Sequence, residues 1–83
     1  MAEIYKITNK INSKVYVGKT ERGYLRRFDE HAREYNKAGS EKRPLYSAMK
    51  KYGLSNFYVE LLEVTDIPEE REIHYIKEYN SYG

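Results

Sequence analysis

Two short runs of alternating apolar and polar residues lie near the start of the chain, IYKIT at 4–8 and KVYVG at 14–18. The segment between them, NKINS, is polar and carries the Asn and Ser residues that are common in turns. This pattern predicts a β-hairpin with one tyrosine in each arm, Tyr5 and Tyr16. If the loop has an even number of residues, both rings lie on the same face, because side chains in strands alternate with period two.

Apolar residues then recur at helical spacing over residues 21–38, and Gly39 is a natural stop for that helix. Its apolar stripe consists of Tyr24, Leu25, Phe28, Ala32 and Tyr35. The segment RPLYSAMKKYG predicts a second, shorter helix with Pro44 in its first turn and Gly53 at its end. Its apolar face consists of Leu45, Ala48, Met49 and Tyr52.

A third strand and a third helix complete the pattern. The segment NFYVELLEV, residues 56–64, alternates and is rich in β-forming residues. Asp66 is then the predicted N-cap of a helix that has Pro68 in its first turn and runs to about Tyr79. The order β-β-α-α-β-α favours an α+β fold, a small three-stranded, mostly antiparallel sheet flanked by three helices.

The size and composition of the chain limit what it can be. Its 83 residues are expected to form one domain, residues 1–83, with a small core. It has no cysteine, which excludes disulfides and thiolate metal sites. No apolar run approaches the ~18 residues of a membrane span, and the N-terminal segment lacks the apolar centre of a signal peptide. We therefore expect a cytoplasmic protein without a membrane partner.

The net charge of +2 is distributed unevenly along the chain. Residues 1–53 carry 13 Lys and Arg against 6 Asp and Glu, whereas residues 54–83 carry 2 against 7. A basic body of this kind is typical of a protein that binds a polyanion, although an ordinary solvated surface can show the same asymmetry. The 10 tyrosines fit either a small core or a wet binding face.

One carboxylate of the third helix lies in an unexpected place. At about 100° per residue, the apolar stripe of this helix consists of Ile73, Tyr75, Ile76 and Tyr79. Glu72 projects near the middle of that stripe, where an unpaired carboxylate is costly. Either Glu72 is partly exposed or paired with an arginine, as most lone helical glutamates are, or it is a metal ligand or a general base.

Arg27 and His31 are four residues apart in the first predicted helix, so they share one side of it. His31 flanks the apolar stripe, and Arg27 lies a little further out. An arginine at the edge of a stripe is usually a surface residue, and a lone histidine is as readily packed or solvated as functional. By themselves, Tyr5 and Tyr16 indicate strand tyrosines that pack under a helix.

Five ordered segments of the chain together resemble the pattern of a known family. EIY at 3–5 and YVG at 16–18 are similar to the two motifs that name the GIY-YIG nucleases. RRFDEH at 26–31, LYSAMKKYG at 45–53 and REIHYIKEYNSYG at 71–83 resemble the three helices of that family. The resemblance covers essentially the whole chain and is greatest to the homing-type branch, which is phage and intron-encoded.

The resemblance implies a DNA endonuclease domain that hydrolyses phosphodiester bonds with one divalent metal ion, Mg²⁺ or Mn²⁺, bound by Glu72. It also implies that Arg27 contacts the scissile phosphate and that His31 assists proton transfer or orients a tyrosine. Tyr5 and Tyr16 would line the active site. We expect Tyr5 to be the general base or to orient the attacking water, with Tyr16 in support.

Two residues that follow Tyr16 complete the expected site. Gly18 would let the backbone approach the substrate, and Lys19 would bring a cation to the phosphate. Lys19, Arg27 and the metal are expected to lower the pKa of the Tyr5 phenol, because positive charges stabilise the phenolate.

The chain departs from the family pattern at three places. Glu3 stands where the first motif has glycine. The homing-type branch often has a second histidine between the first two helices, but here that stretch reads AGSEKRP and contains none. Lys42 or Arg43 could take part of that histidine's role in binding the substrate. The chain also stops at NSYG, before the asparagine that borders the site in relatives. Either the chain is the N-terminal catalytic part of a longer protein, with DNA specificity supplied by a missing C-terminal region or a partner protein, or its site is incomplete.

Two other functions agree with parts of the sequence. A non-catalytic nucleic-acid-binding module would use basic residues to hold phosphates and exposed tyrosines to stack on bases. Such a module need not keep Glu72 or Arg27, so the presence of both disfavours it. A structural or protein-interaction domain would leave the charge asymmetry unexplained.

Overall fold

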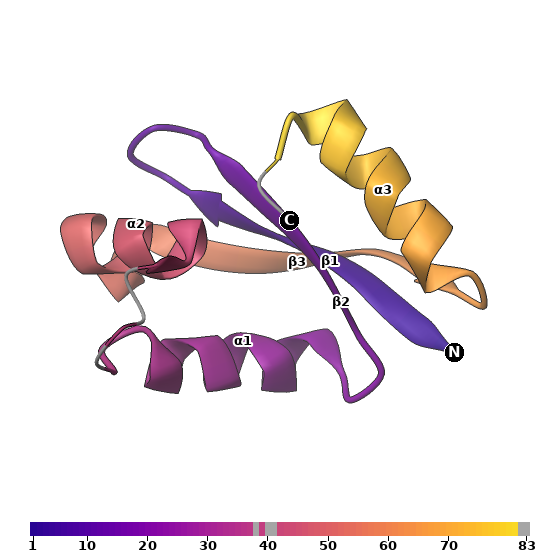
Figure 1. Ribbon diagram of the computed structural model, residues 1–83, viewed down its shortest axis with the longest axis horizontal. Coiled ribbons are helices and arrows are strands. Elements are labelled where there is room, and N and C mark those ends of the chain that lie inside the picture. Colours follow the sequence, from indigo (N-terminus) through magenta and orange to yellow (C-terminus); the bar gives the residue numbers. More distant parts are fainter. Residues whose placement is uncertain (38, 40–41, 82–83) are drawn as a thin grey trace.

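The structure is a computed structural model, and it describes residues 1–37, 39 and 42–81. The elements in chain order (Figure 1) are β1 (Ala2–Asn9), β2 (Val15–Thr20), α1 (Tyr24–Glu34), α2 (Pro44–Tyr52), a short 3₁₀ helix η2 (Leu54–Asn56), β3 (Phe57–Thr65) and α3 (Pro68–Tyr79). This order confirms the predicted α+β fold. In the part of the chain that is described, no helix is both long enough and apolar enough to cross a membrane.

The three strands form one antiparallel sheet in the order β2-β1-β3, with β1 in the centre. Tyr5 of β1 is paired with Gly18 of β2 and with Leu61 of β3. The register between β1 and β3 shifts between Ile4 and Tyr5, as at a β-bulge. Because β1 has a partner on each side, it contributes fully buried residues such as Ile4 and Ile7.

The hairpin places Tyr5 and Tyr16 on the same face of the sheet, as predicted. The Asn9 amide donates a hydrogen bond to the Lys14 carbonyl at 2.9 Å, which leaves a four-residue loop between them. In the ladder Ile7 pairs with Tyr16, and directly opposed residues share a face. Tyr5 lies two residues from Ile7 on the same strand, so it shares that face too.

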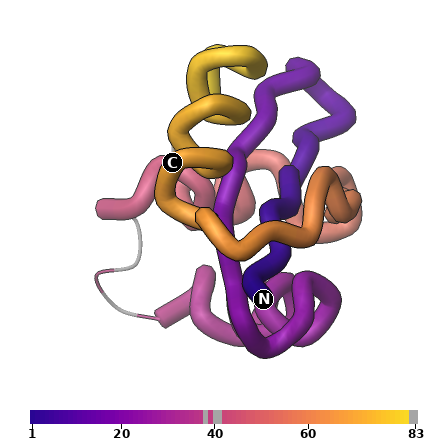
Figure 2. The backbone as a smooth tube through the Cα atoms, turned by 90° about the vertical axis from the view of Figure 1, so that its right-hand side faces the viewer, coloured from indigo at the N-terminus to yellow at the C-terminus, as the bar shows by residue number. Residues whose placement is uncertain are grey.

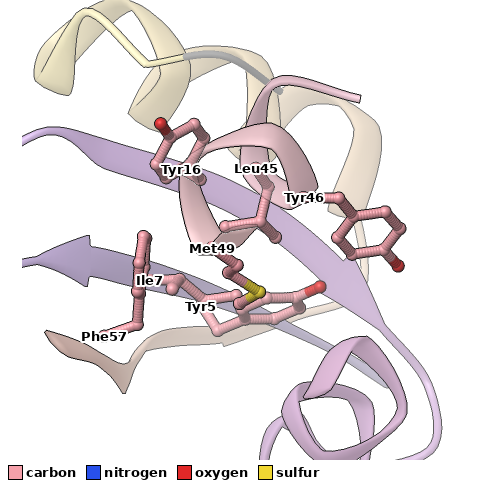
Figure 3. Close-up of a cluster of buried hydrophobic side chains, with 7 residues drawn as sticks. All are labelled: Tyr5, Ile7, Tyr16, Leu45, Tyr46, Met49 and Phe57. Carbon is pink, nitrogen blue, oxygen red and sulfur yellow. The ribbon is translucent and has the colours of Figure 1, made fainter. Parts of the chain in front are cut away.

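Figures 1 and 2 show α1 and α3 on opposite sides of the strands. The hydrophobic core lies between the sheet and the α1 and α2 side. Its buried members, drawn in Figure 3, are Tyr5, Ile7, Tyr16, Leu45, Tyr46, Met49 and Phe57. The helix α2 has the predicted bounds, with Pro44 in the first turn and Gly53 directly after it. Tyr46 was not expected in its buried face, yet only 3% of it is exposed.

The helix α1 is shorter than the predicted segment 21–38. It ends at Glu34, where the amide of Lys37 bonds to the Glu34 carbonyl in a tighter turn, well before Gly39. The prediction that Leu25 belongs to the inward face is wrong, since that side chain is 63% exposed. The buried residue of α1 is His31, and Leu25 lies beyond the edge of the face on which His31 is centred.

The N-terminus of α1 is capped by a residue from another element. Gly23, with φ of +95°, precedes the helix and has no side chain to cap it. Instead, the Tyr24 amide donates a hydrogen bond of 2.7 Å to the carboxylate of Glu3 on β1. A negative charge at a helix N-terminus is favourable because it faces unpaired amide groups. Glu3, which replaces the first glycine of the family motif, therefore joins β1 to α1.

The start of α3 differs from the prediction. Asp66 is not its cap: the N-cap position is Ile67, which makes no side-chain hydrogen bond. The Ile67 amide is instead bound by Thr65 Oγ1 at 3.0 Å, so the strand end supplies the polar partner. Ile73 is 52% exposed and does not belong to the inward stripe in which it was predicted.

Replacement of Glu3 by alanine should lower the free energy of unfolding by about 1 kcal/mol, the usual cost of a lost helix cap. The measurement is urea unfolding followed by circular dichroism at neutral pH and low salt. Glu21→Ala is the control, because Glu21 is an exposed carboxylate in the adjacent β2–α1 connection. Its effect should stay within about 0.5 kcal/mol. Equal losses in both variants would contradict the capping role of Glu3.

Candidate active site

A cavity of about 240 Å³ opens beside the edge strand β2, where residues of α1, α2 and α3 meet the sheet. It is lined by Tyr5, Ile7, Tyr16, Val17, Gly18, Lys19, Arg27, His31, Arg43, Pro44, Leu45 and Glu72. Of the residues expected in the site from the sequence, all but one line this cavity, and they come from β1, β2, α1 and α3. Lys42 is exposed and does not line the cavity, whereas its neighbour Arg43 does.

Tyr5 projects from the central strand with its hydroxyl at the cavity wall. Only 4% of the residue is exposed, and its Oη lies 3.1 Å from His31 Nε2. Burial raises the pKa of the Tyr5 phenol above its usual value, and the charge of Arg27 lowers it by less. Arg27 thus lowers the pKa of the Tyr5 phenol as expected, but in the protein alone burial outweighs it. Tyr5 is a neutral phenol at neutral pH.

His31 connects Tyr5 to a second tyrosine and a carboxylate that sequence reasoning missed. His31 Nδ1 lies 2.7 Å from Tyr46 Oη, and the Tyr46 hydroxyl donates a hydrogen bond of 3.0 Å to Glu34 Oε2. Two spacings could have indicated these partners: Glu34 follows His31 by three residues, and Tyr46 precedes the core residue Met49 by three.

The imidazole of His31 is neutral at neutral pH. Burial, with the nearby charges of Arg27 and Arg43, lowers the pKa of His31 to about 4. Only 3% of the residue is exposed, so a charged ring would lose nearly all its hydration. A neutral imidazole has one N–H donor and one free nitrogen, so it can take a proton from one neighbour while it donates to another.

Gly18 lies directly under the ring of Tyr5. A Cβ atom at this position would be 2.5 Å from Tyr5 Oη and 2.6 Å from Tyr5 Cζ, which is too close for either atom. The two residues are a cross-strand pair on one face, so the phenol occupies the space that a side chain at residue 18 would fill. In this structure Gly18 therefore accommodates Tyr5.

Tyr16 lines the same cavity but is oriented differently. It is 6% exposed, and its ring packs in the core. Figure 3 shows the hydroxyls of Tyr5 and Tyr46 on one side of the cluster, whereas the hydroxyl of Tyr16 points away from them. The two motif tyrosines therefore share a face and a cavity but direct their hydroxyls differently.

Arg27 is held in the cavity wall by a carboxylate on its own helix. Its Nη1 lies 3.0 Å from Glu30 Oε1, and the same oxygen is 2.8 Å from Arg22 Nη2. The Arg27 side chain is 22% exposed, so it can still reach a ligand in the cavity. Glu30, which the sequence reasoning also missed, is thus an orienting partner three residues away on α1.

Glu72 faces the cavity from α3 on the opposite side. Its side chain is 21% exposed, and its Oε1 lies 3.7 Å from Lys19 Nζ. Lys19 is also 3.6 Å from Glu69, a more exposed carboxylate of the same helix. The sequence left open whether Glu72 is partly exposed and paired or bound to a metal. Glu72 is partly exposed, and its cationic partner is a lysine and not an arginine.

The donor set fits a divalent cation of the Mg²⁺ type only if the substrate and water supply most of its ligands. Within residues 1–37, 39 and 42–81, no group of three or more His, Cys, Asp or Glu is arranged to hold a metal ion. Glu72 is a single accessible carboxylate at the cavity wall. Mg²⁺ commonly binds through one or two carboxylates, waters and phosphate oxygens, so one carboxylate is compatible with it.

The cavity carries more positive than negative charge. Its lining includes the cations Lys19, Arg27 and Arg43 and one carboxylate, Glu72. Arg43 also lies over the ring of Tyr46, with its guanidinium carbon 5.0 Å from the ring centre. A concave site of this size and charge is suited to an anionic group such as a phosphate.

Comparisons with known proteins agree with this geometry. The family model of the GIY-YIG catalytic domain matches residues 1–83. Among curated proteins, an MSV199 domain-containing protein of Invertebrate iridescent virus 6, 146R, is 34% identical over 86 residues. That match covers 94% of this chain and 33% of the viral protein, so the chain spans about a third of that relative's length.

The fold is also similar to that of solved structures. The catalytic domain of the homing endonuclease I-TevI matches with a TM-score of 0.82 and 30% identity, over 99% of this chain and 96% of that one. A mutant of the same domain, with one glutamate changed to alanine, matches with a TM-score of 0.82 and 31% identity, over 100% and 93%. The chain therefore belongs to the GIY-YIG nuclease family as an endonuclease catalytic domain, and its fold is similar to that of a homing endonuclease's catalytic domain.

Proposed function

We propose that this domain hydrolyses phosphodiester bonds of DNA in the cavity beside β2, in a metal-dependent reaction. The observation that carries the proposal is the buried hydrogen bond between Tyr5 and His31 at the wall of a cavity that also holds Arg27 and Glu72. The cavity thus brings together a phenol, a neutral imidazole, a cation that can bind phosphate and a carboxylate. These groups can activate water and neutralise charge, as hydrolysis requires.

Tyr5 and His31 together activate the attacking water. The water gives a proton to Tyr5 Oη while the phenol passes its own proton to His31 Nε2, 3.1 Å away. This transfer needs no free phenolate, which agrees with the raised pKa of the Tyr5 phenol. The hydroxide then attacks phosphorus, and the leaving oxygen departs with the bonding electrons and takes a proton from solvent, while His31 later returns its proton to solvent. Tyr16 lines the same cavity from the adjacent strand and supports the site through the packing of its ring, with its hydroxyl directed away from that of Tyr5.

Arg27 holds a phosphate oxygen, and its pairing with Glu30 keeps the guanidinium oriented toward the cavity. Lys19 and Arg43 supply further positive charge, and Lys42 can contact the DNA backbone outside the cavity. Glu72 would hold one divalent ion, Mg²⁺ or Mn²⁺. When bound, this ion neutralises charge on the phosphate oxygens.

Target selection is proposed to lie outside this domain. The cavity accounts for contacts with a phosphate but contains no element suited to reading base edges in a groove. We propose that a C-terminal DNA-binding region or a partner protein supplies sequence specificity.

The function is tested with Tyr5→Phe, which removes one hydroxyl and keeps the ring. Cleavage of plasmid DNA with Mg²⁺ should fall by about 10²–10⁴-fold, the usual effect of losing an acid–base group. DNA affinity, measured in Ca²⁺, should hardly change because the phosphate is bound by Arg27 and not by Tyr5. Tyr58→Phe is the control, since Tyr58 lies on β3, is 39% exposed and does not line the cavity. Equal cleavage by wild type and Tyr5→Phe would exclude Tyr5 from the chemistry.

Glu72→Gln should abolish metal-dependent cleavage and the heat of Mn²⁺ binding in calorimetry. The free energy of unfolding should change by no more than about 1 kcal/mol, because the contact of Glu72 with Lys19 is loose and partly exposed. Glu69→Gln is a matched control, since it removes the other carboxylate that Lys19 contacts. A large loss of stability in Glu72→Gln with unchanged Mn²⁺ binding would make Glu72 a structural residue.

The low pKa of His31 predicts how stability depends on pH. The folded-state pKa of about 4 lies below the unfolded value of about 6.5, so the unfolded chain binds this proton first as the pH falls. The free energy of unfolding should therefore decrease by a few kcal/mol between about pH 6.5 and 4. Urea unfolding at several pH values measures it, and His31→Gln should lose most of the slope above pH 5. The same slope in both proteins would mean that His31 is not the group responsible.

A further inference from the structure

Tyr5 and His31 belong to a longer series of hydrogen-bonded side chains, here called the relay, which continues beyond His31. The residues at the far end of the relay have no role in the chemistry proposed above. Beyond His31 lie Tyr46, at 2.7 Å from Nδ1, and Glu34, which accepts the Tyr46 hydrogen bond. Tyr46 is 3% exposed, whereas Glu34 is partly exposed. Four side chains from β1, α1 and α2 thus form one continuous series from the cavity wall to the exterior.

The hydrogens of this series can be placed from one end. Glu34 is ionised at neutral pH, because the hydrogen bond from Tyr46 lowers the pKa of its carboxyl. An ionised carboxylate only accepts, so the single hydrogen of the Tyr46 hydroxyl points to Glu34. Burial and the same bond raise the pKa of the Tyr46 phenol, so that hydrogen remains on Tyr46.

The state of Tyr46 then decides the tautomer of His31. The Tyr46 oxygen has used its only hydrogen, so it can only accept from the imidazole. His31 Nδ1 must therefore carry the ring hydrogen, and Nε2 is left as the free nitrogen that faces Tyr5. In the opposite tautomer Nδ1 would need a hydrogen from Tyr46, and Glu34 would face an oxygen lone pair at 3.0 Å.

We propose that Glu34 and Tyr46 are positioning residues that fix His31 in the tautomer with Nε2 free to take a proton from Tyr5. The inference rests on the proposed function of the Tyr5–His31 pair. When Nε2 receives the proton, the ring becomes cationic, and its Nδ1 hydrogen remains bound to Tyr46. The carboxylate of Glu34 then lies behind Tyr46 as the nearest negative charge in the series and stabilises the imidazolium.

The tautomer is measured directly by two-bond ¹H–¹⁵N correlation spectra of the imidazole at pH 7.5, without DNA or metal. His74→Gln in all proteins leaves His31 as the sole histidine, because the chain has two. The expected wild-type signal is a protonated Nδ1 and an unprotonated Nε2. In Tyr46→Phe, which removes the acceptor of Nδ1, and in Glu34→Ala, the Nε2-protonated tautomer should become populated.

Controls come from the same two helices. Asp29→Asn removes an exposed carboxylate of α1 that is paired with Arg33. Tyr52→Phe removes a hydroxyl from α2 outside the relay. Neither should change the tautomer. An unchanged Nδ1-protonated ring in both Tyr46→Phe and Glu34→Ala, or an Nε2-protonated ring in wild type, would overturn the proposal.

Cleavage kinetics provide the second readout. In single-turnover reactions with Mg²⁺, Glu34→Ala should lower the cleavage rate by about 10–100-fold with little change in KM, because the imidazole stays in place but spends less time in the active tautomer. A tautomer shift without any change in rate would remove the catalytic part of the proposal. If wild type shows the expected tautomer but cleaves no DNA, the proposed function fails while the hydrogen-bond arrangement stands.

Discussion

The two hydrogen bonds of the buried His31 imidazole are the contacts on which the fold and the site both depend. The imidazole belongs to α1, and it is bonded to β1 through Tyr5 and to α2 through Tyr46. A buried polar ring is tolerated only while its nitrogens have partners, so these three elements must keep their relative positions. The same requirement holds the Tyr5 hydroxyl at the cavity wall, since the bond that satisfies His31 also orients the phenol. Stability and catalytic geometry therefore share one set of contacts.

The pairing of Tyr5 with Gly18 is a second constraint of this kind. The phenol crosses β2 on its way to His31, and it can do so only because residue 18 has no side chain. A methyl group there would meet the ring at less than 3 Å and move it away from Nε2. The tyrosine of the first family motif and the glycine of the second are thus one structural unit, joined across the hairpin. The spacing of the two motifs follows from the register that pairs them.

The elements of this fold could be predicted from the sequence because alternation and helical spacing report which side chains of one element are buried. The strands, the bounds of α2 and the shared face of Tyr5 and Tyr16 follow from such local patterns. Errors arose at the ends of elements, where a distant group decides. Glu3 caps α1 from β1, and Thr65, not Asp66, binds the first amide before α3. No local pattern contains those partners.

In the candidate site too, residues marked by a local pattern were predicted, and residues that depend on contacts between elements were missed. Tyr5, His31 and Glu72 were indicated by family motifs or by a polar residue at an apolar position, and all three line the cavity. Tyr46 and Glu34 were missed because each is unremarkable on its own helix. Tyr46 contacts His31 and Glu34 only where α1 and α2 meet, and the sequence between these helices does not indicate that contact. The spacing of three residues from His31 to Glu34 was visible, but a carboxylate on a helix surface is common.

The charges of the site connect substrate binding to proton transfer. Acidic residues of the C-terminal third pair with cations elsewhere, such as Glu60 with Lys6 at 3.6 Å and Glu63 with Arg71 at 2.9 Å. The cavity itself remains predominantly positive, and the charges of Arg27 and Arg43 contribute to the low pKa of His31. Under the proposed function, a bound phosphate offsets those charges and raises the basicity of the imidazole. The divalent ion proposed on Glu72 would act in the opposite direction, because it adds positive charge to the site. The basicity of His31 in the complex would therefore depend on the balance of charge between phosphate and metal, which couples substrate binding to proton transfer.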